Sequence, residues 1–152
     1  MTPGTVDLKI VRDRLQLVNQ SLADLRSLPQ TTFEDFAADR RNILSADAAL
    51  RRALEALFDI ARHLLAKGAG VGSLEYREVA VKSAEHGIVT DPDLAAKMVE
   101  MAGYRNRLTH HYDEITPEEL YGILTGDLGD LDGLADELRA AAARLAEQSK
   151  RR

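Results

Sequence analysis

Apolar residues recur at steps of three and four along most of the chain, and turn-forming residues divide this pattern into five segments. The first segment carries Leu8, Val11, Leu15, Val18, Leu22 and Leu25, a spacing typical of the buried face of an amphipathic helix. This helix is predicted to end near Pro29. A second helix is predicted from a capping-box pattern at Thr32 and Asp35 to about Lys67, with soft ends that allow a break near Arg40.

A cluster of three glycines, Gly68, Gly70 and Gly72, follows the second predicted helix. Their spacing lacks the final interval of the dinucleotide-binding fingerprint, and they follow a helix instead of a strand. We therefore expect a helix C-cap and a loop. Ser73 is predicted to cap a short third helix that runs to about His86 and is ended by Gly87.

The fourth predicted helix begins at Thr90, Asp91, Pro92 and Asp93, which combine a cap, a proline suited to the first turn and an acid that favours the helix dipole. Its buried stripe is expected to contain Leu94, Met98, Met101 and Leu108. The same spacing places Arg105 inside this stripe. Because a buried unpaired charge is costly, Arg105 is expected to meet a partner, a ligand or an interface.

The last predicted helix begins at Thr116, Pro117 and Glu119, a second capping box with proline in the first turn. Its apolar side carries Leu120, Leu124, Leu128, Leu131, Ala135, Leu138, Ala142 and Leu145. Another face carries Gly122, Gly126, Gly129 and Gly133, each costing a helix about 1 kcal/mol relative to alanine. This row indicates either a close backbone approach by another helix or a local kink, and the sequence favours neither.

Composition places these helices in one soluble domain. A chain of 152 residues fits one domain spanning 1–152 with a single core, and its excess of alanine and leucine over aromatic and β-branched residues predicts an all-α fold. The absence of cysteine, and of a signal peptide or membrane-spanning run, predicts a cytoplasmic protein with no membrane association. Residues 147–152 are expected to form a frayed basic tail.

The segment from Gly103 to Thr116 concentrates reactive side chains. It contains Arg105, His110, His111 and Tyr112, which offer a phosphate ligand, proton acceptors and a modifiable hydroxyl. Arg105 and His110 are separated by about 140° on an ideal helix, so we expect them not to share a face. Joint action on one phosphate would then need a distorted helix end or two copies paired across a symmetric interface.

The chemistry expected of such a site is cleavage of RNA without a metal or another cofactor. The carboxylates are scattered, thiolates are absent, and the net charge of −5 argues against a general nucleic-acid coating protein. In RNA the 2′-hydroxyl is a built-in nucleophile, histidine can take its proton, and arginine can stabilise the phosphorane. Single-stranded RNA is the expected substrate because it is flexible enough to reach in-line geometry.

The reactive segment resembles the Arg-x4-His-x-Tyr motif of HEPN-domain proteins, specifically the HepT-like toxins of HepT/MntA toxin–antitoxin pairs, and the likeness extends to the predicted helix order. The resemblance implies an up-and-down antiparallel bundle of about five helices that forms a homodimer. It implies RNA cleavage in the dimer cleft by Arg105 and His110, with Asn106 and His111 as auxiliary residues. It also implies a nucleotidyltransferase antitoxin that transfers AMP to Tyr112.

Other interpretations of the same residues are structural. On spacing alone, an interhelical salt bridge for Arg105 and a polar helix end for the two histidines are favoured over catalysis. The resemblance reverses this order. Glu55, Asp59 and His63 lie on one face of the second predicted helix and are interpreted as a polar stripe in preference to a metal site. Under the alternative function, the chain is a non-catalytic subunit that binds a nucleotidyltransferase and serves as its acceptor.

Overall fold

The computed structural model describes residues 4–72, 74–110 and 115–151 of the chain. Over these ranges it contains seven α-helices and no strand. The helices are α1 (Leu8–Arg26), α2 (Phe33–Ala37), α3 (Arg40–Ala69), α4 (Tyr76–Glu85), α5 (Pro92–His110), α6 (Pro117–Gly126) and α7 (Leu128–Lys150). The prediction of an all-α fold is confirmed.

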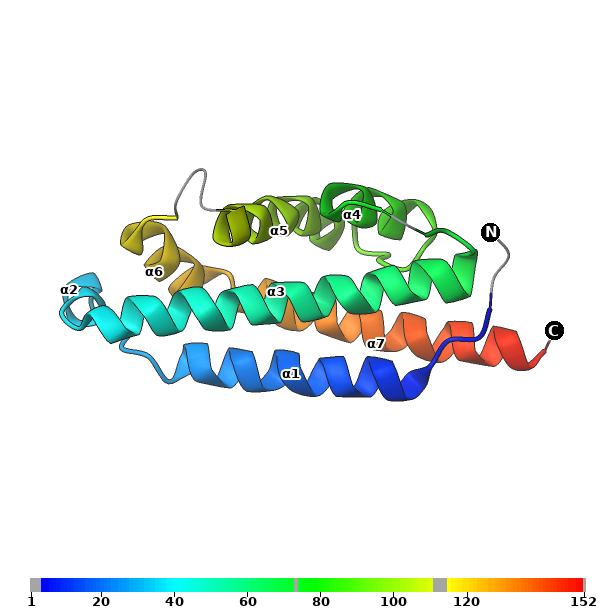
Figure 1. Cartoon of the computed structure of the whole chain (residues 1–152), viewed down its shortest axis with the longest axis horizontal. Coiled ribbons are helices and arrows are strands. Elements are labelled where there is room, and N and C mark those ends of the chain that lie inside the picture. The colour runs from blue at the N-terminus through cyan, green and yellow to red at the C-terminus, as the bar shows by residue number, and fades with distance from the viewer. Residues whose placement is uncertain (1–3, 73, 111–114, 152) are drawn as a thin grey trace.

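The long helix α3 is the centre of the bundle. It contacts α1, α4, α5, α6 and α7, and it runs the length of the molecule with α1 on one side and α4 and α5 on the other (Figure 1). The helices α1, α3, α5 and α7 run in alternating directions, which is the predicted up-and-down arrangement (Figure 1). Twelve residues of α3 are buried, including Phe58, Ile60 and Leu64, so this helix supplies much of the core.

Capping side chains explain where the helices begin. Asp7 accepts hydrogen bonds from the backbone amides of the first turn of α1, and Thr32 accepts one from the Asp35 amide at 3.1 Å. The full capping box predicted at Thr116 and Glu119 is present at the start of α6. A cap of this kind stabilises a helix by about 1 kcal/mol, which is why these starts were visible in the sequence.

Two predicted helices are each divided in the structure, so the described part of the chain has seven helices instead of about five. The break near Arg40 is confirmed, because Asp39 accepts a hydrogen bond from the Arg41 amide and caps α3 as a new helix. Ser73, the predicted cap of α4, lies outside the described residues. Helix α4 begins at Tyr76, with Glu75 at its N-cap, a few residues later than predicted.

Left-handed glycines end two helices as the sequence indicated. Gly70 has φ 72° and caps α3, and Gly87 follows α4 with φ 69°. Positive φ values cost glycine little because it has no Cβ. The path of the chain from α3 to α4 and from α4 towards α5 therefore depends on these two residues.

The last predicted helix is broken at Asp127, which separates α6 from α7. Within the described chain, a Cβ added at Gly122, Gly126 or Gly129 would meet nothing within 4 Å, whereas one at Gly133 would lie 3.3 Å from the Leu94 side chain. The kink interpretation of the glycine row is therefore the one that the structure supports. A close backbone approach by another helix of the same chain is not found at the first three glycines.

Helix α7 continues to Lys150, so it includes most of the segment for which a frayed basic tail is predicted. Among the described residues, no helix is long and apolar enough to cross a membrane. The amino and carboxyl ends of the described chain lie at the same end of the bundle (Figure 1).

Candidate active site

Helix α5 presents Arg105 to the interior of the protein. Met98, Met101 and Leu108 are buried as predicted, and Leu94 is partly buried. The Arg105 side chain lies in this stripe and is only 16% exposed. A guanidinium at that depth needs compensating interactions, because desolvation of an unpaired charge is expensive.

Arg105 obtains these interactions from an aromatic ring and a carboxylate. Its guanidinium carbon lies 3.9 Å from the centroid of the Tyr76 ring, which is within cation–π range. Its Nη2 atom lies 3.8 Å from Oε1 of Glu55. Its Nε atom is buried and has no hydrogen-bond partner among the described residues. Arg105 is therefore held mainly through the face of its guanidinium, and the predicted need for a partner is confirmed.

A second arginine approaches the same ring from α3. The guanidinium carbon of Arg62 lies 5.0 Å from the Tyr76 centroid, and Nη2 of Arg62 donates a hydrogen bond to the Leu74 carbonyl at 2.9 Å. The Tyr76 ring also packs edge-on against Phe58 with centroids 5.2 Å apart. The first residue of α4 thus connects the core to both arginines.

These side chains border an open pocket of about 360 Å³. Its lining consists of Arg62, Glu75, Tyr76, Arg105, Asn106 and His110. Asn106 accepts a long hydrogen bond of 3.4 Å from Nη1 of Arg105. His110 is exposed and is the last residue of α5. The pocket combines cationic side chains with an imidazole, groups that can stabilise charge on a phosphate and accept a proton.

Arg105 and His110 border the same pocket in one chain, with Asn106 between them in the sequence. From their rotation on an ideal helix, they were not expected to share a face. Their joint action on one phosphate, through a distorted helix end or a second copy, stays a prediction.

The predicted residues His111 and Tyr112 lie outside the described residues. The two described ends of this segment are joined by an ion pair, in which Arg107 of α5 donates to both carboxylate oxygens of Glu119 at 2.9 and 3.0 Å. These hydrogen bonds are the main reason why the pKa of Glu119 lies below its ordinary value. Glu119 also closes the capping box with Thr116, so one carboxylate connects α5 to the start of α6.

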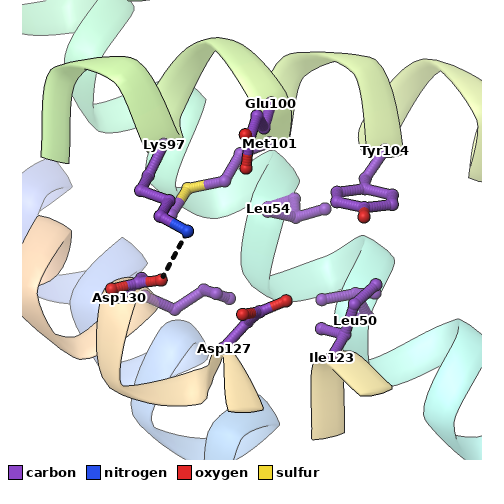
Figure 2. A pocket seen from close by; sticks show the side chains of 10 residues that line it. Leu50, Leu54, Lys97, Glu100, Met101, Tyr104, Ile123, Asp127 and Asp130 are labelled. Atoms are coloured by element: carbon purple, nitrogen blue, oxygen red, sulfur yellow. Dashed lines mark ion pairs between the residues drawn. The ribbon is translucent and has the colours of Figure 1, made fainter. Parts of the chain in front are cut away.

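A second cavity lies between α3, α5 and the junction of α6 with α7 (Figure 2). Tyr104 forms part of its wall, and Lys97 lies 3.9 Å from Asp130 across it (Figure 2). Burial raises the pKa of Asp127 on the same wall. The free volume of about 20 Å³ holds roughly one water molecule. The cavity is too small for a nucleotide, and Tyr104 packs against the hydrophobic core.

The residues of the polar stripe on α3 each contact a different part of the chain. Asp59 forms an ion pair with Arg14 at 3.3 Å, and His63 accepts a hydrogen bond from the Asp7 amide at 2.9 Å. Burial lowers the pKa of this histidine, which agrees with its role as a neutral acceptor. Over the described ranges, no group of three or more ligating side chains is placed to hold a metal ion.

Four residues of the pocket region were not predicted from the sequence to belong to the site: Glu55, Arg62, Glu75 and Tyr76. Glu55 and Arg62 are seven residues apart on α3, so they lie on one face of that helix. Charged residues at this spacing beside an apolar stripe were the available signal. Tyr76 carried no comparable signal, because its role depends on a contact between α4 and α5.

Comparison with known proteins relates the chain to ribonucleases. The chain is 29% identical over 112 residues to the tRNA nuclease HepT of Aphanizomenon flos-aquae, and the alignment covers 74% of this chain and 76% of that protein.

Two solved structures share the fold. One is a tri-AMPylated HEPN toxin of Shewanella oneidensis in complex with an MNT antitoxin, with a TM-score of 0.77 and 21% identity over 86% of this chain and 97% of that one. The other is a toxin–antitoxin complex with AMP-PNP, with a TM-score of 0.76 and 20% identity over 87% of this chain and 98% of that one. The model of the family described as ribonuclease HepT-like matches residues 18–138, and the chain belongs to this family.

Proposed function

We propose that this protein is the toxin of a toxin–antitoxin pair and acts as a metal-independent endoribonuclease. The observation that carries the proposal is that Arg105 and His110, the two motif residues predicted to be catalytic, border one pocket. The family supports the reaction class, and the curated relative that cleaves tRNA makes tRNA the first substrate to test.

The reaction would use the substrate's own 2′-hydroxyl. His110 takes the proton from this hydroxyl, and the resulting oxygen attacks the adjacent phosphorus. Arg105 stabilises the negative charge that develops on the non-bridging oxygens. The bond to the 5′-oxygen of the next nucleotide breaks, and that oxygen leaves after gaining a proton. The products are a 2′,3′-cyclic phosphate and a 5′-hydroxyl end. Asn106 and His111 are the proposed auxiliary residues of this reaction.

The partner in this proposal is a nucleotidyltransferase antitoxin that transfers AMP to Tyr112. Support comes from the Shewanella oneidensis relative, which is an AMPylated toxin in complex with its antitoxin. In the sequence, Tyr112 follows the pocket residue His110 by two positions. Adenylate attached there would add bulk and negative charge beside the pocket, which opposes the approach of a phosphodiester.

We also propose that the protein is a cytoplasmic homodimer, as the family resemblance implies. The pocket is open and His110 is exposed, so a second copy placed over it would enclose the substrate between two sets of cationic side chains. A two-fold axis would bring the same patch of each chain together. Sedimentation analysis at micromolar concentration tests this assembly, and a monomer at that concentration would contradict it.

The decisive experiment is cleavage of purified tRNA by antitoxin-free protein in the presence of EDTA. The rate is expected to fall roughly 100-fold or more in Arg105→Ala and in His110→Ala. Arg139→Ala and His86→Ala are matched controls, because both residues are exposed and lie outside the pocket. Both controls should retain the parent rate, and mass spectrometry should find cyclic phosphate ends.

Equal cleavage by the parent and both pocket variants would contradict the proposed catalytic pair. A parent protein that leaves RNA intact but is adenylated at Tyr112 would instead favour the acceptor-subunit alternative. The intact mass of protein co-expressed with its nucleotidyltransferase distinguishes this outcome, because Tyr112→Phe would remove the added adenylate.

A further inference from the structure

Arg62 is a pocket residue that the proposed reaction does not use. It comes from the C-terminal third of α3, far in sequence from the motif, yet it borders the same pocket as Arg105 and His110. It is partly buried, so its charge has lost part of its hydration. Its position in the pocket makes it available to an anion that enters there.

The geometry relates Arg62 to Arg105 through one aromatic ring. Because the two guanidinium carbons lie 5.0 Å and 3.9 Å from the centroid of Tyr76, they are within about 9 Å of each other. Successive phosphates of a single nucleic-acid strand lie close together along the strand. Two guanidinium groups at this separation can therefore contact neighbouring phosphates.

The hydrogen-bonding capacity of Arg62 is largely unused. A guanidinium has five N–H donors, and among the described residues Arg62 makes one hydrogen bond, to the Leu74 carbonyl. It forms no ion pair with a carboxylate in the described part of the chain, whereas Arg105 has Glu55 nearby. The bond to Leu74 fixes the orientation of the group and leaves other donors for an incoming anion.

We propose that Arg62 binds a backbone phosphate adjacent to the scissile phosphate of the RNA strand, while the ring of Tyr76 holds both guanidinium groups in place. This proposal rests on the proposed ribonuclease function and extends it to a second phosphate-binding position. Arg105 acts on the phosphate that reacts, and Arg62 fixes the register of the strand. Phosphate contacts of this kind position a strand without reading its sequence.

The competing explanation is structural, because Arg62 also ties α3 to the segment before α4 through Leu74. A role limited to that bond would affect folding but would leave the electrostatic component of RNA binding unchanged. The number of phosphate contacts can be measured separately from stability, since each contact releases counterions and contributes to the dependence of affinity on salt.

The test measures binding of a fluorescein-labelled, mixed-sequence single-stranded 2′-O-methyl RNA, which lacks the nucleophile and is not cleaved. Affinity is determined by anisotropy between about 50 and 200 mM salt for the parent, Arg62→Gln, Arg62→Lys and Arg144→Gln. Arg144 is the matched control, because it is exposed, donates to a backbone carbonyl, that of Gly87, at 3.0 Å, and lies outside the pocket.

Loss of one phosphate contact should reduce the slope of log affinity against log salt by about 0.7. Arg62→Gln is expected to show this reduction, whereas Arg62→Lys and Arg144→Gln should keep the parent slope. In tRNA cleavage, Arg62→Gln should raise KM roughly tenfold, the effect of losing one charged hydrogen bond, and change kcat little. Arg105→Gln should lower kcat instead.

A parent slope retained in Arg62→Gln would overturn the proposal, even if that variant unfolds at a lower temperature. Equal reductions in Arg62→Gln and Arg144→Gln would overturn it as well, because they would reflect net charge alone. Both outcomes leave the ribonuclease function intact. A parent protein that neither binds the labelled RNA nor cleaves tRNA would overturn the proposed function together with this inference.

Discussion

The ion pair between Arg107 and Glu119 joins the end of α5 to the start of α6, and removal of the Glu119 carboxylate should loosen this junction. Glu119 accepts two hydrogen bonds from Arg107 and one from the Thr116 amide at 3.4 Å. Its own amide donates to the Thr116 hydroxyl at 3.1 Å. Glu119→Ala removes the carboxylate interactions together, whereas Glu119→Gln removes the charge and preserves a capping-box side chain.

The size of the effect follows from these contacts. The capping interaction contributes about 1 kcal/mol, and an ion pair at this exposure contributes roughly 0.2–1 kcal/mol. Glu119→Ala should therefore lower the free energy of unfolding by about 1–2 kcal/mol, and Glu119→Gln by about 0.5 kcal/mol. For a chain of this size, each kcal/mol corresponds to a change in Tm of roughly 2–4 °C.

Thermal unfolding followed by circular dichroism measures these differences, with Glu118→Ala and Glu118→Gln as matched controls. Glu118 is an acid in the same first turn of α6, so its variants report the loss of helix-dipole stabilisation alone. The pKa of Glu119 is lowered in the folded state by Arg107. Its stabilisation is therefore present above the ordinary value of 4.5 and is lost as the pH falls through the folded pKa.

Equal decreases in Tm for Glu119→Ala and Glu118→Ala at pH 7 would contradict this prediction. So would a difference in Tm between the parent and Glu119→Gln that remains unchanged well below pH 4.5. Either result would mean that the hydrogen bonds to Arg107 do not stabilise the junction.

Three further predictions concern the rest of the bundle. Gly122→Ala should raise the free energy of unfolding by about 1 kcal/mol in urea denaturation, because a helical Cβ there meets nothing within 4 Å; a decrease would indicate that a neighbouring molecule packs on this face. Burial lowers the pKa of His63, so its neutral form stabilises the fold above pH 6.5 and this stabilisation is lost as the pH falls through the folded pKa. The parent should therefore lose more stability between pH 7.5 and pH 5 than His63→Gln, and equal losses would contradict this role. Burial raises the pKa of Asp127. Its contribution to stability is therefore present below pH 3.8 and is lost as the pH rises through the folded pKa. Asp127→Asn should raise Tm at pH 7, and a lower Tm would show that the carboxylate is needed at the helix junction.

The elements of the fold were largely predictable because local signals specify them. The hydrogen bond from the Asp35 amide to Thr32 and the capping box of Thr116 involve residues three apart. The left-handed conformation of Gly70 likewise follows from its own lack of a side chain. The break at Asp127 was weakly signalled, because the leucine period continues through it and only the glycine row indicated a kink.

The candidate site was predicted only where it lies on one helix. Arg105 and His110 were predicted because they belong to a short motif. The need of the Arg105 charge for a partner followed from its place in an apolar stripe. The identity of that partner could not be predicted. The ring of Tyr76 reaches Arg105 through the packing of α4 against α5, and the approach of Glu55 depends on the packing of α3 against α5.

The stacking of the Arg105 guanidinium on the Tyr76 ring affects the energy of substrate binding. A guanidinium fixed by strong hydrogen bonds to a carboxylate must break them before it can bind another anion. Arg105 lies 3.9 Å from the Tyr76 centroid, and its closest described carboxylate contact is a long one of 3.8 Å. Among the described residues, its two terminal nitrogens make only long contacts, to Asn106 and to Glu55, so they can turn to a phosphate while the stacked face stays in place. Such a preorganised cation has little reorganisation energy to overcome when charge develops in the transition state.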